Sequence, residues 1–327
     1  MSWRTRELLG ACLRSLCAAL GDRLAAGTAE VIVVDNASGD GSAERVRDRF
    51  PAVHLIANRE NRGYAAGNNQ GIAAARGRNV MLLNPDTEVP REAVERLEAS
   101  LAERPHAGAA APMLAHPDGR PQASVRGFPT PLALLGAVTG LARLVPAGSP
   151  LAAYRPRALP AAPAVVDQPM ASCLLLRGET LRAVGGFDEA FPMFFNDVDL
   201  CWRLRQAGWE IWFVPEARVV HHGGASTRQV RLAMLWESHR SLHHYYQKHY
   251  RGRLIWPLYG LIIAAIYAGA GARSAVLLLR QAFGKRSSLV LVLVLMLVLV
   301  LETLSSRSTS TSTSTSMSTS RSGLLNT

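Results

Sequence analysis

A short apolar run that ends in a carboxylate, at residues 30–35, constrains this fold more than any other feature. Its consecutive β-branched residues predict a buried strand. Similar runs at 53–56 and 80–83 predict two more strands, and helical patterns at 42–50 and 67–76 separate the three. Alternating strands and helices predict an α/β fold with a mostly parallel sheet flanked by helices.

The rest of the chain continues this pattern less regularly. Helices are also expected at 5–20, 90–103, 179–184 and 198–207, and strands at 171–176 and 210–214. Residues 105–165 are rich in Pro, Ala and Gly and have weak periodicity, so we expect a long excursion there.

The formal net charge of +11 favours an anionic partner: nucleic acid, anionic lipid or a phosphorylated substrate. The sequence has neither Cys/His finger spacing nor a helix-turn-helix signature, and its basic residues are dispersed. We therefore expect no nucleic-acid partner, which leaves anionic lipid and phosphorylated substrates.

The four cysteines, Cys12, Cys17, Cys173 and Cys201, form no Cys-x-x-Cys pair. Each has apolar neighbours in the sequence, so we expect buried, reduced thiols and a cytosolic location. Met1 leads directly into an amphipathic pattern with arginines, so no signal peptide is expected.

Two polar segments are candidates for binding a nucleotide. Asp35 ends the first strand and can accept from a base N–H or a ribose hydroxyl; residues 58–71 form a Gly- and Asn-rich stretch in which Arg62 can face a phosphate. The alternatives are a plain strand-to-helix turn and a surface loop. The candidate nucleotide-binding residues are Asp35, Asn36, Ser38, Asn61, Arg62, Gly63, Gly67 and Asn68.

A third segment suits a metal ion. Asp86 follows a strand and a proline, and its carboxylate is a suitable hard-oxygen ligand for Mg²⁺ or Mn²⁺ on a diphosphate. The alternative is an Asx-type turn. His221 and His222 follow a later apolar stretch and precede a Gly-Gly turn, so they could complete the metal site or contact the diphosphate.

The fourth segment carries Asp188, Asp197 and Asp199. Asp197 and Asp199 lie at a predicted helix N-terminus, where the helix dipole favours negative charge. One carboxylate there could remove a proton from an acceptor hydroxyl. The alternative is simple helix capping, which Asp199 fits better than Asp197.

In this order, these segments resemble the family 2 glycosyltransferases, especially the rhamnosyltransferase-like branch of bacterial cell-surface polysaccharide synthesis. The resemblance covers about residues 2–250. It implies a GT-A fold and transfer, with inversion, from a dTDP-, UDP- or GDP-sugar to a hydroxyl of a glycan or lipid-linked acceptor. The excursion at 105–165 would then help to form the acceptor site.

The resemblance also implies roles for single residues. Asp35 would lie against the nucleotide base, and Asp86 would remain from the family's metal-binding D-x-D element. Asp197 matches the catalytic base, and His221 would contact the metal or the diphosphate. Asp188 and Asp199 would contact the acceptor or support the site.

The chain departs from the family near its start. Members generally open with a strand that ends in Ser-Trp-Asn or a similar turn, whereas here Ser2-Trp3-Arg4 follows Met1 directly. We therefore expect the first strand to be missing. A catalytically impaired, nucleotide-binding protein at the membrane is the alternative function. Asn196 replaces the family's commoner glutamate and leaves the case for Asp197 intact.

The C-terminal region is apolar and then of low complexity. Residues 254–272 carry no charge and are long enough to span a membrane, whereas the apolar run 289–301 is short for a span. We expect a catalytic domain at 1–228, a helical membrane-associating region at 229–304 and a disordered Ser/Thr-rich tail at 305–327. The protein would work at the cytoplasmic face of the inner or plasma membrane, either peripherally or with a C-terminal span.

Overall fold

The computed structural model describes residues 1–146, 148–223 and 231–278. The chain divides into two compact units, Met1–Tyr267 and Ala268–Thr327, so the first unit extends beyond the predicted boundary at 228. That boundary, the apolar run 289–301 and the predicted tail all lie outside the described residues.

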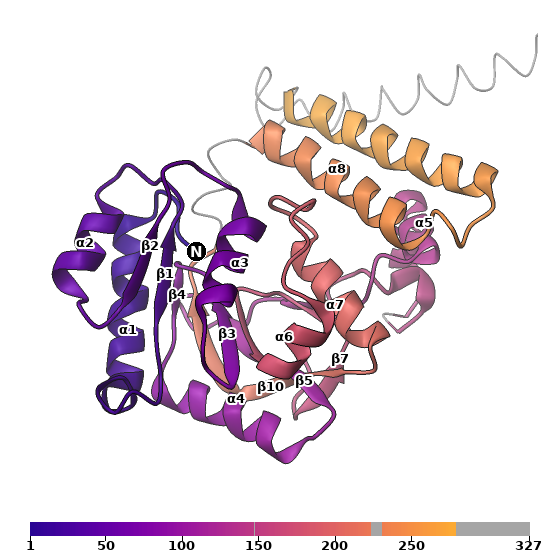
Figure 1. Cartoon of the computed structure of the whole chain (residues 1–327). Helices are drawn as coiled ribbons and strands as arrows, with labels where there is room; N and C mark the ends of the chain where they lie inside the picture. Colours follow the sequence, from indigo (N-terminus) through magenta and orange to yellow (C-terminus); the bar gives the residue numbers. More distant parts are fainter. Residues whose placement is uncertain (147, 224–230, 279–327) are drawn as a thin grey trace, which may run out of the picture. The chain divides into compact units, whose positions relative to one another are not determined.

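The N-terminal part alternates helices and strands as predicted (Figure 1). Its elements are α1 (Arg6–Ala25), β1 (Ile32–Asp35), α2 (Ser42–Arg49), β2 (His54–Ala57), α3 (Tyr64–Ala74) and β3 (Asn79–Leu83). Strands β1 and β2 are parallel, with Ile32 opposite His54 and Asp35 opposite Ala57. This confirms the predicted parallel pairing of the first two strands.

The remaining elements build a second, larger sheet and the helices around it. They are β4 (Thr87–Glu88), α4 (Arg91–Glu103), β5 (Ala107–Ala115), β6 (Val125–Arg126), α5 (Pro131–Thr139), η1 (Leu141–Arg143), η2 (Pro150–Ala152), β7 (Ala164–Val166), β8 (Gln168–Pro169), β9 (Cys173–Arg177), α6 (Gly178–Val184), α7 (Asn196–Gln206), β10 (Glu210–His221) and α8 (Arg231–His249). The sheet has the order β3-β9-β5-β10-β4, and β7 pairs with β10.

The strand directions are more mixed than the predicted, mostly parallel sheet. In the larger sheet β5 and β10 are parallel, whereas β3–β9, β5–β9, β10–β4 and β10–β7 are antiparallel. Residues 105–165 contain a further strand of this sheet, β5, which is buried along its whole length. Its sequence, rich in alanine, gives no β-branched signal, so the strand was not predicted.

The larger sheet is the middle layer of the fold because both of its faces are apolar. Along β9, Cys173 and Leu175 pack into one core with α1 and α4, whereas Leu174 and Leu176 pack into the other with α6 and α7. Successive side chains of a strand point to opposite faces, so a continuously apolar strand requires helices on both sides. This arrangement confirms the predicted α/β class with flanking helices.

A cavity of about 480 Å³ lies between β1 and β3, lined by apolar residues that include Val31, Val34, Val80 and Leu82. Within the described ranges, β1 bonds to β2 along one edge and to Ser2 alone along the other. The first strand expected from the family is thus represented by one parallel bridge, between Ser2 and Asp35.

The expectation of buried, reduced thiols holds for three of the four cysteines. Cys12, Cys173 and Cys201 are free and buried, whereas Cys17 is only partly buried, contrary to expectation. Burial raises the pKa of the Cys12 thiol to about 11.

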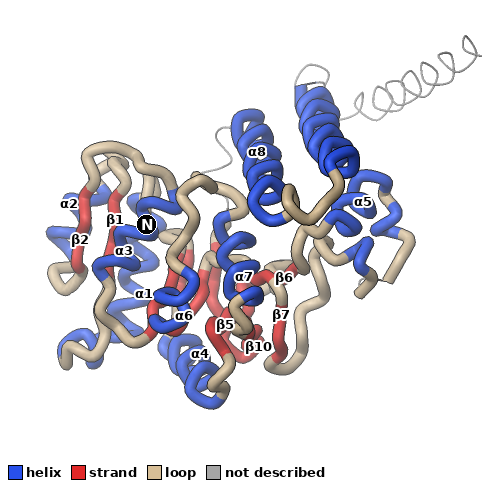
Figure 2. Tube along the Cα trace, turned by 45° about the vertical axis from the view of Figure 1, so that its right-hand side comes forward, coloured by secondary structure: helices blue, strands red, loops and turns tan. Residues whose placement is uncertain are grey.

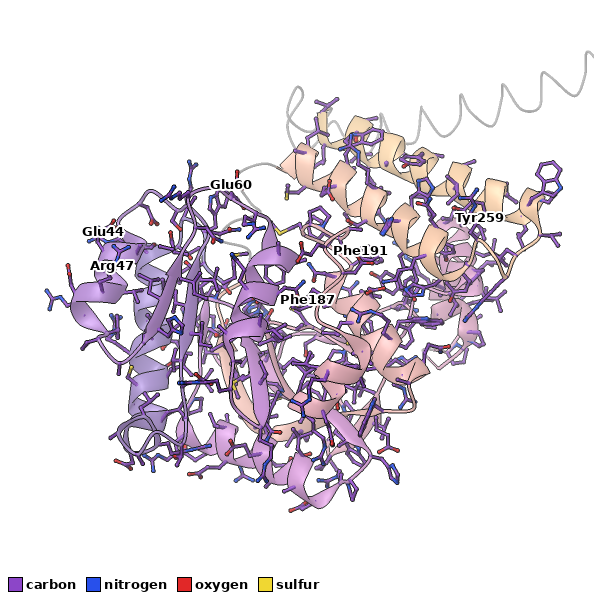
Figure 3. All side chains as sticks on the ribbon, viewed as in Figure 1. Glu44, Arg47, Glu60, Phe187, Phe191 and Tyr259 are labelled. Carbon is purple, nitrogen blue, oxygen red and sulfur yellow. The ribbon has the colours of Figure 1, made fainter. Side chains whose placement is uncertain are left out.

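A third, aromatic cluster joins α7, α8 and the helix Trp256–Leu278. It contains Phe191, Phe195, Tyr245 and Tyr246, with Tyr259 packed against it. Figure 2 shows the helices α7 and α8, and Figure 3 labels Phe191 and Tyr259. In the described part of the chain, one helix, Trp256–Leu278, is long and apolar enough to cross a membrane by its length and composition. Its mean hydropathy is 1.8. The prediction of an apolar C-terminal helix is therefore confirmed for this segment.

Candidate active site

The end of β10 brings His221 to the turn that follows β3. Strands β10 and β4 are antiparallel, with His221 opposite Thr87, so the imidazole reaches Asp86 on the adjacent turn. His221 Nε2 lies 3.5 Å from Asp86 Oδ1, and both residues are buried. On the other side of the ring, His221 Nδ1 lies 2.8 Å from Gln122 Oε1, which fixes the ring so that Nε2 faces the carboxylate.

The charge state of Asp86 suits a cation. Burial acts to raise the pKa of this carboxyl, but the hydrogen bond and positive charge of His221 outweigh burial and lower the pKa below its usual value. A carboxylate and an imidazole make a suitable pair of ligands for a divalent ion whose other ligands are phosphate oxygens and water. Among the described residues, no group of three His, Cys, Asp or Glu side chains is arranged to hold a metal.

A second His–carboxylate pair lies beside the first. His222 Nε2 is 2.8 Å from Glu88 Oε1, and both side chains are substantially more exposed than Asp86 and His221. The residues alone gave both histidines the same candidate role, and the family resemblance selected His221. The structure distinguishes them as well, because His221 ends β10 and is buried beside Asp86, whereas His222 follows the strand and is more exposed.

Asp35 ends β1 in the position predicted for a nucleotide contact. The residue is buried, and its Oδ2 accepts a hydrogen bond of 3.2 Å from the Ser38 amide. Its Oδ1 is also buried, and among the described residues it has no hydrogen-bond partner. A buried acceptor without a partner is costly in a folded chain. It is explained here if a ligand donates to it.

Asn36 organises the neighbouring loop. Its side-chain nitrogen donates to Asn61 Oδ1 and to the Gly63 carbonyl, and its oxygen accepts from Asn58 and from the Arg62 amide. These four bonds use all the donors and acceptors of the amide. Asn36 therefore holds the loop in place, and its direct contact with a nucleotide stays a prediction.

The other candidate nucleotide residues lie around the same loop. Ser38 accepts from the Arg4 amide, and the Asn68 side chain donates to the Tyr64 carbonyl. Gly63 has φ of +86°, which only glycine adopts without strain, and it precedes the first residue of α3. The structure thus brings the two predicted segments together, with Arg62 exposed at their surface.

Tyr64 connects the loop to the rest of the site, a role that the sequence did not indicate. Its hydroxyl donates to Asn84 Oδ1 at 2.9 Å, on the turn that carries Asp86. Burial, followed by the negative charges of Asp197 and Asp86, raises the pKa of this phenol. Both carboxylates are therefore close enough to Tyr64 to act on its charge.

Asp197 lies in the first turn of α7. Val198 N donates to Asp197 Oδ1 at 2.8 Å, an interaction within the turn itself. Burial raises the pKa of Asp197, and the hydrogen bonds and the charge of Arg126 only partly offset it. A carboxylate with a raised pKa and few strong partners is suited to accept a proton.

A pocket of about 170 Å³ adjoins Asp197 and is lined by residues from the 105–165 excursion. Arg126 and Tyr154 face it, with the guanidinium carbon 5.7 Å from the centre of the Tyr154 ring. Neither residue was among the predicted site residues, because the excursion shows no motif. The role of the excursion in an acceptor site stays a prediction.

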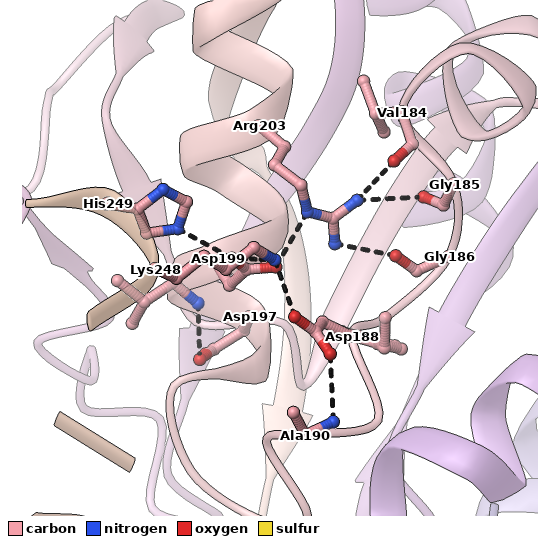
Figure 4. A network of polar contacts seen from close by, with 12 residues as sticks. Val184, Gly185, Gly186, Asp188, Ala190, Asp197, Asp199, Arg203, Lys248 and His249 are labelled. Carbon is pink, nitrogen blue, oxygen red and sulfur yellow. Dashed lines mark hydrogen bonds and ion pairs between the residues drawn. The ribbon is translucent and has the colours of Figure 1, made fainter. Parts of the chain in front are cut away.

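Asp199, in contrast, is the centre of a structural network (Figure 4). Its carboxylate contacts Arg203, Lys248 and His249 at 2.8 Å each. Lys248 also contacts Asp188 at 2.7 Å, which links α8 to the turn before α7. Although burial acts to raise it, hydrogen bonds from His249 and Lys248 lower the pKa of Asp199 to about 2. A carboxylate bound by Arg203, Lys248 and an imidazole is a poor base.

The fold and the site together define a nucleotide-sugar-dependent glycosyltransferase of GT-A type. Residues 3–144 match the family model described as glycosyl transferase family 2. The chain is 33% identical, over 222 residues, to the N-acetylglucosaminyl-diphospho-decaprenol L-rhamnosyltransferase of Mycobacterium tuberculosis (strain ATCC 25618 / H37Rv); the match covers 64% of this chain and 72% of that protein. The chain belongs to glycosyl transferase family 2.

Two further comparisons agree with this assignment. The chain is 28% identical over 190 residues to the low-salt glycan biosynthesis hexosyltransferase Agl10 of Haloferax volcanii; this match covers 55% of this chain and 54% of that protein. The structure of the mannosyltransferase PcManGT from Pyrobaculum calidifontis, in complex with GDP-Man and Mn²⁺, superposes with a TM-score of 0.52 and 18% identity over 92% of this chain and 78% of that chain. This last likeness concerns the fold.

Proposed function

We propose that this glycosyltransferase is a metal-dependent, inverting enzyme that moves a sugar, by analogy a rhamnosyl group, onto a lipid-diphosphate-linked glycan. The observation that supports it most is the pocket beside Asp197, where a weakly held carboxylate with a raised pKa adjoins Arg126. The rhamnosyltransferase from M. tuberculosis, whose name specifies a diphospho-decaprenol acceptor, supports the choice of substrates.

In this proposal Asp197 removes the proton from the acceptor hydroxyl. The acceptor oxygen then forms a bond to the anomeric carbon while the bond from that carbon to the diphosphate oxygen breaks, which inverts the anomeric centre. Asp35 Oδ1 would accept a hydrogen bond from the nucleotide, and Asp86 with His221 would hold a divalent cation. The cation would neutralise the charge of the departing diphosphate.

Of the two expected cations, Mn²⁺ fits this pair of ligands better than Mg²⁺. Mg²⁺ prefers oxygen ligands and gives up its water reluctantly. The structure of the mannosyltransferase PcManGT contains Mn²⁺, which supports the choice of Mn²⁺. The donor nucleotide is expected to be a dTDP-, UDP- or GDP-sugar. The enzyme would work at the cytoplasmic face of the membrane, either peripherally or with Trp256–Leu278 as a span.

A transfer assay tests the proposal. Purified full-length protein would be incubated with a lipid-diphosphate-linked N-acetylglucosamine acceptor and with each of the three donor classes, in Mn²⁺, Mg²⁺ or a chelator. Transfer from one class that a chelator abolishes, with inversion shown by NMR of the product, would support the proposal. Transfer at full rate in the chelator would exclude the metal.

A catalytically impaired nucleotide-binding protein is the second candidate, and the cavity between β1 and β3 favours it. The cavity lies beside Gly67 and Asn68, two of the predicted nucleotide-binding residues. Saturable nucleotide binding without transfer from any donor, under conditions where the rhamnosyltransferase relative is active, would support this candidate.

A further inference from the structure

The excursion between β6 and β7 presents large apolar side chains to solvent. Leu132, Leu135 and Val138 of α5 are 53%, 50% and 57% exposed, and the stripe continues through Leu141 and Leu144, which are 42% and 80% exposed. Within α5, the spacing of three residues keeps Leu132, Leu135 and Val138 along one side.

The opposite side of α5 is the one that packs against the protein. It carries the small residues Ala133 and Gly136, both buried. A Cβ on Gly136 would lie 2.1 Å from the Leu151 carbonyl oxygen, so α5 and η2 are in direct backbone contact there. The helix thus buries Ala133 and Gly136 and exposes Leu132, Leu135 and Val138, the reverse of the usual pattern of a surface helix.

The start of the helix Trp256–Leu278 adds to this apolar surface. Ile255, Trp256 and Leu261 are 72%, 85% and 67% exposed. Leu134 of α5 packs against the same aromatic cluster as Leu254 and Tyr259, so the two apolar segments are neighbours. In Figures 1 and 2, α5 lies beside the turn that precedes this helix.

The charge around this surface has one sign. The sequence has no acidic residue between Asp118 and Asp167 but five arginines, and none from residue 238 to residue 267 but three arginines and Lys248. Arg143, Arg251 and Arg253 are exposed next to the apolar residues. Contiguous exposed apolar side chains mark an interaction site, and a cationic rim selects an anionic partner.

We propose that α5, η1 and the first turns of the helix Trp256–Leu278 form one docking surface that inserts into the headgroup region of an anionic bilayer. The apolar side chains would enter the boundary between headgroups and acyl chains, with Trp256 at the interface and the arginines on lipid phosphates. A protein partner would need an equally large apolar face with an acidic rim; a second copy of this chain has the same cationic rim and would be repelled.

This surface deepens the proposed function and rests on it for its biological meaning. Tyr154, which faces the pocket beside Asp197, follows η2, and η2 packs against α5. A bilayer under α5 would therefore hold a lipid-linked acceptor with its diphosphate close to Arg126.

A fluorescence experiment on the full chain tests the docking surface. An environment-sensitive probe would be attached to Leu135→Cys on α5 or, as a matched control, to Val165→Cys on β7, both in a Cys17→Ser background. Val165 is also an exposed apolar residue, and it lies at the edge of the larger sheet. The vesicles contain phosphatidylcholine alone or phosphatidylcholine with phosphatidylglycerol, with and without a lipid-borne nitroxide quencher.

We expect the emission at position 135 to rise several-fold with phosphatidylglycerol vesicles and to be quenched by the nitroxide, while position 165 does not respond. Changing Leu132, Leu135 and Val138 together to Gln should weaken vesicle binding at least tenfold, and Arg143→Gln or Arg253→Gln by about fivefold each at low salt.

Three results would overturn the proposal. The first is a probe at position 135 that does not respond while the protein still sediments with vesicles, which would assign binding to other residues. The second is an equal response at positions 135 and 165. The third is emission at position 135 that rises with protein concentration in the absence of lipid, which would assign the surface to a second copy. Because no outcome depends on sugar transfer, a protein that docks but transfers nothing would contradict the proposed function alone.

Discussion

His221 Nε2 and Asp86 Oδ1 lie 3.5 Å apart, although 135 positions of the chain separate the two residues. The antiparallel pairing of β10 with β4 creates this proximity, and Gln122 fixes the imidazole from behind. Both residues are buried, and burying a carboxylate is costly unless it serves a ligand or is fully hydrogen-bonded.

The first prediction concerns this pair. Asp86→Ala and His221→Ala should each abolish Mn²⁺-dependent binding of nucleoside diphosphate, because each removes one of the two protein ligands. Isothermal titration calorimetry with and without Mn²⁺ measures this. The adjacent pair supplies the control: His222→Ala and Glu88→Ala should keep metal-dependent binding. Unchanged affinity in Asp86→Ala would remove Asp86 from the metal site.

The second prediction concerns the base. Asp197→Asn should retain donor binding and lower turnover by roughly two to four orders of magnitude, the usual contribution of general base catalysis. Burial raises the pKa of Asp197, and the base must be deprotonated. Activity of the wild type should therefore fall as the pH drops through a value above the usual ~3.9 of aspartate. Near-normal turnover of Asp197→Asn would move the base to another residue.

The third prediction concerns Arg126. Arg126→Met should raise the KM for a diphosphate-linked acceptor about tenfold or more and leave donor affinity unchanged, because a guanidinium pairs with phosphate oxygens. It should also move the acidic limb of the pH profile upward, since the Arg126 charge offsets the effect of burial on the Asp197 pKa. Arg120→Met, on an exposed turn, is the control. A change in donor affinity alone would place Arg126 at the donor.

The fourth prediction concerns Asp199 and stability. Its folded pKa of about 2 lies below the unfolded value of ~3.9, so its contribution is fully present above the unfolded pKa and is lost as the pH falls toward 2. Asp199→Asn should cost roughly 3 kcal/mol in urea unfolding at pH 7 and progressively less below pH 4. Asp167→Asn, in a partly exposed pair with Arg157, should cost under about 1 kcal/mol. Equal losses for the two variants would refute the network role.

The fifth prediction concerns the cavity between β1 and β3. Ser2 pairs in parallel with Asp35, so residues added before Met1 would run beside Val34 and Ile32 and fill the space. Burial lowers the pKa of the Met1 amino group, so an extension would also relieve an unfavourable charge. An extension of six β-branched residues before Met1 should raise the Tm, by about 2–4 °C for each kcal/mol gained in the free energy of unfolding. Six Gly and Ser residues should not. Equal melting of both extended proteins would rule out strand insertion.

The helices and strands up to β3 follow from the sequence because their signals are local. The runs before Asp35 and Leu83 are short and β-branched or aliphatic, and each ends in polar residues. Local sequence also located the polar segments that reach the strand ends. The nine-residue strand β5 escaped prediction because alanine has little preference for strands and is buried there only by its neighbours.

By itself, then, the sequence determined the α/β class, the family and the carboxylates at the strand ends. Only the tertiary structure decided how these residues are used. It separated Asp197, which keeps a raised pKa, from Asp199, which is bound by Arg203, Lys248 and His249, although the two aspartates lie within one helical turn. It also separated His221 from His222 and brought Arg126 to the pocket. These distinctions depend on partners far away in the chain, and burial and charge act through space rather than along the sequence.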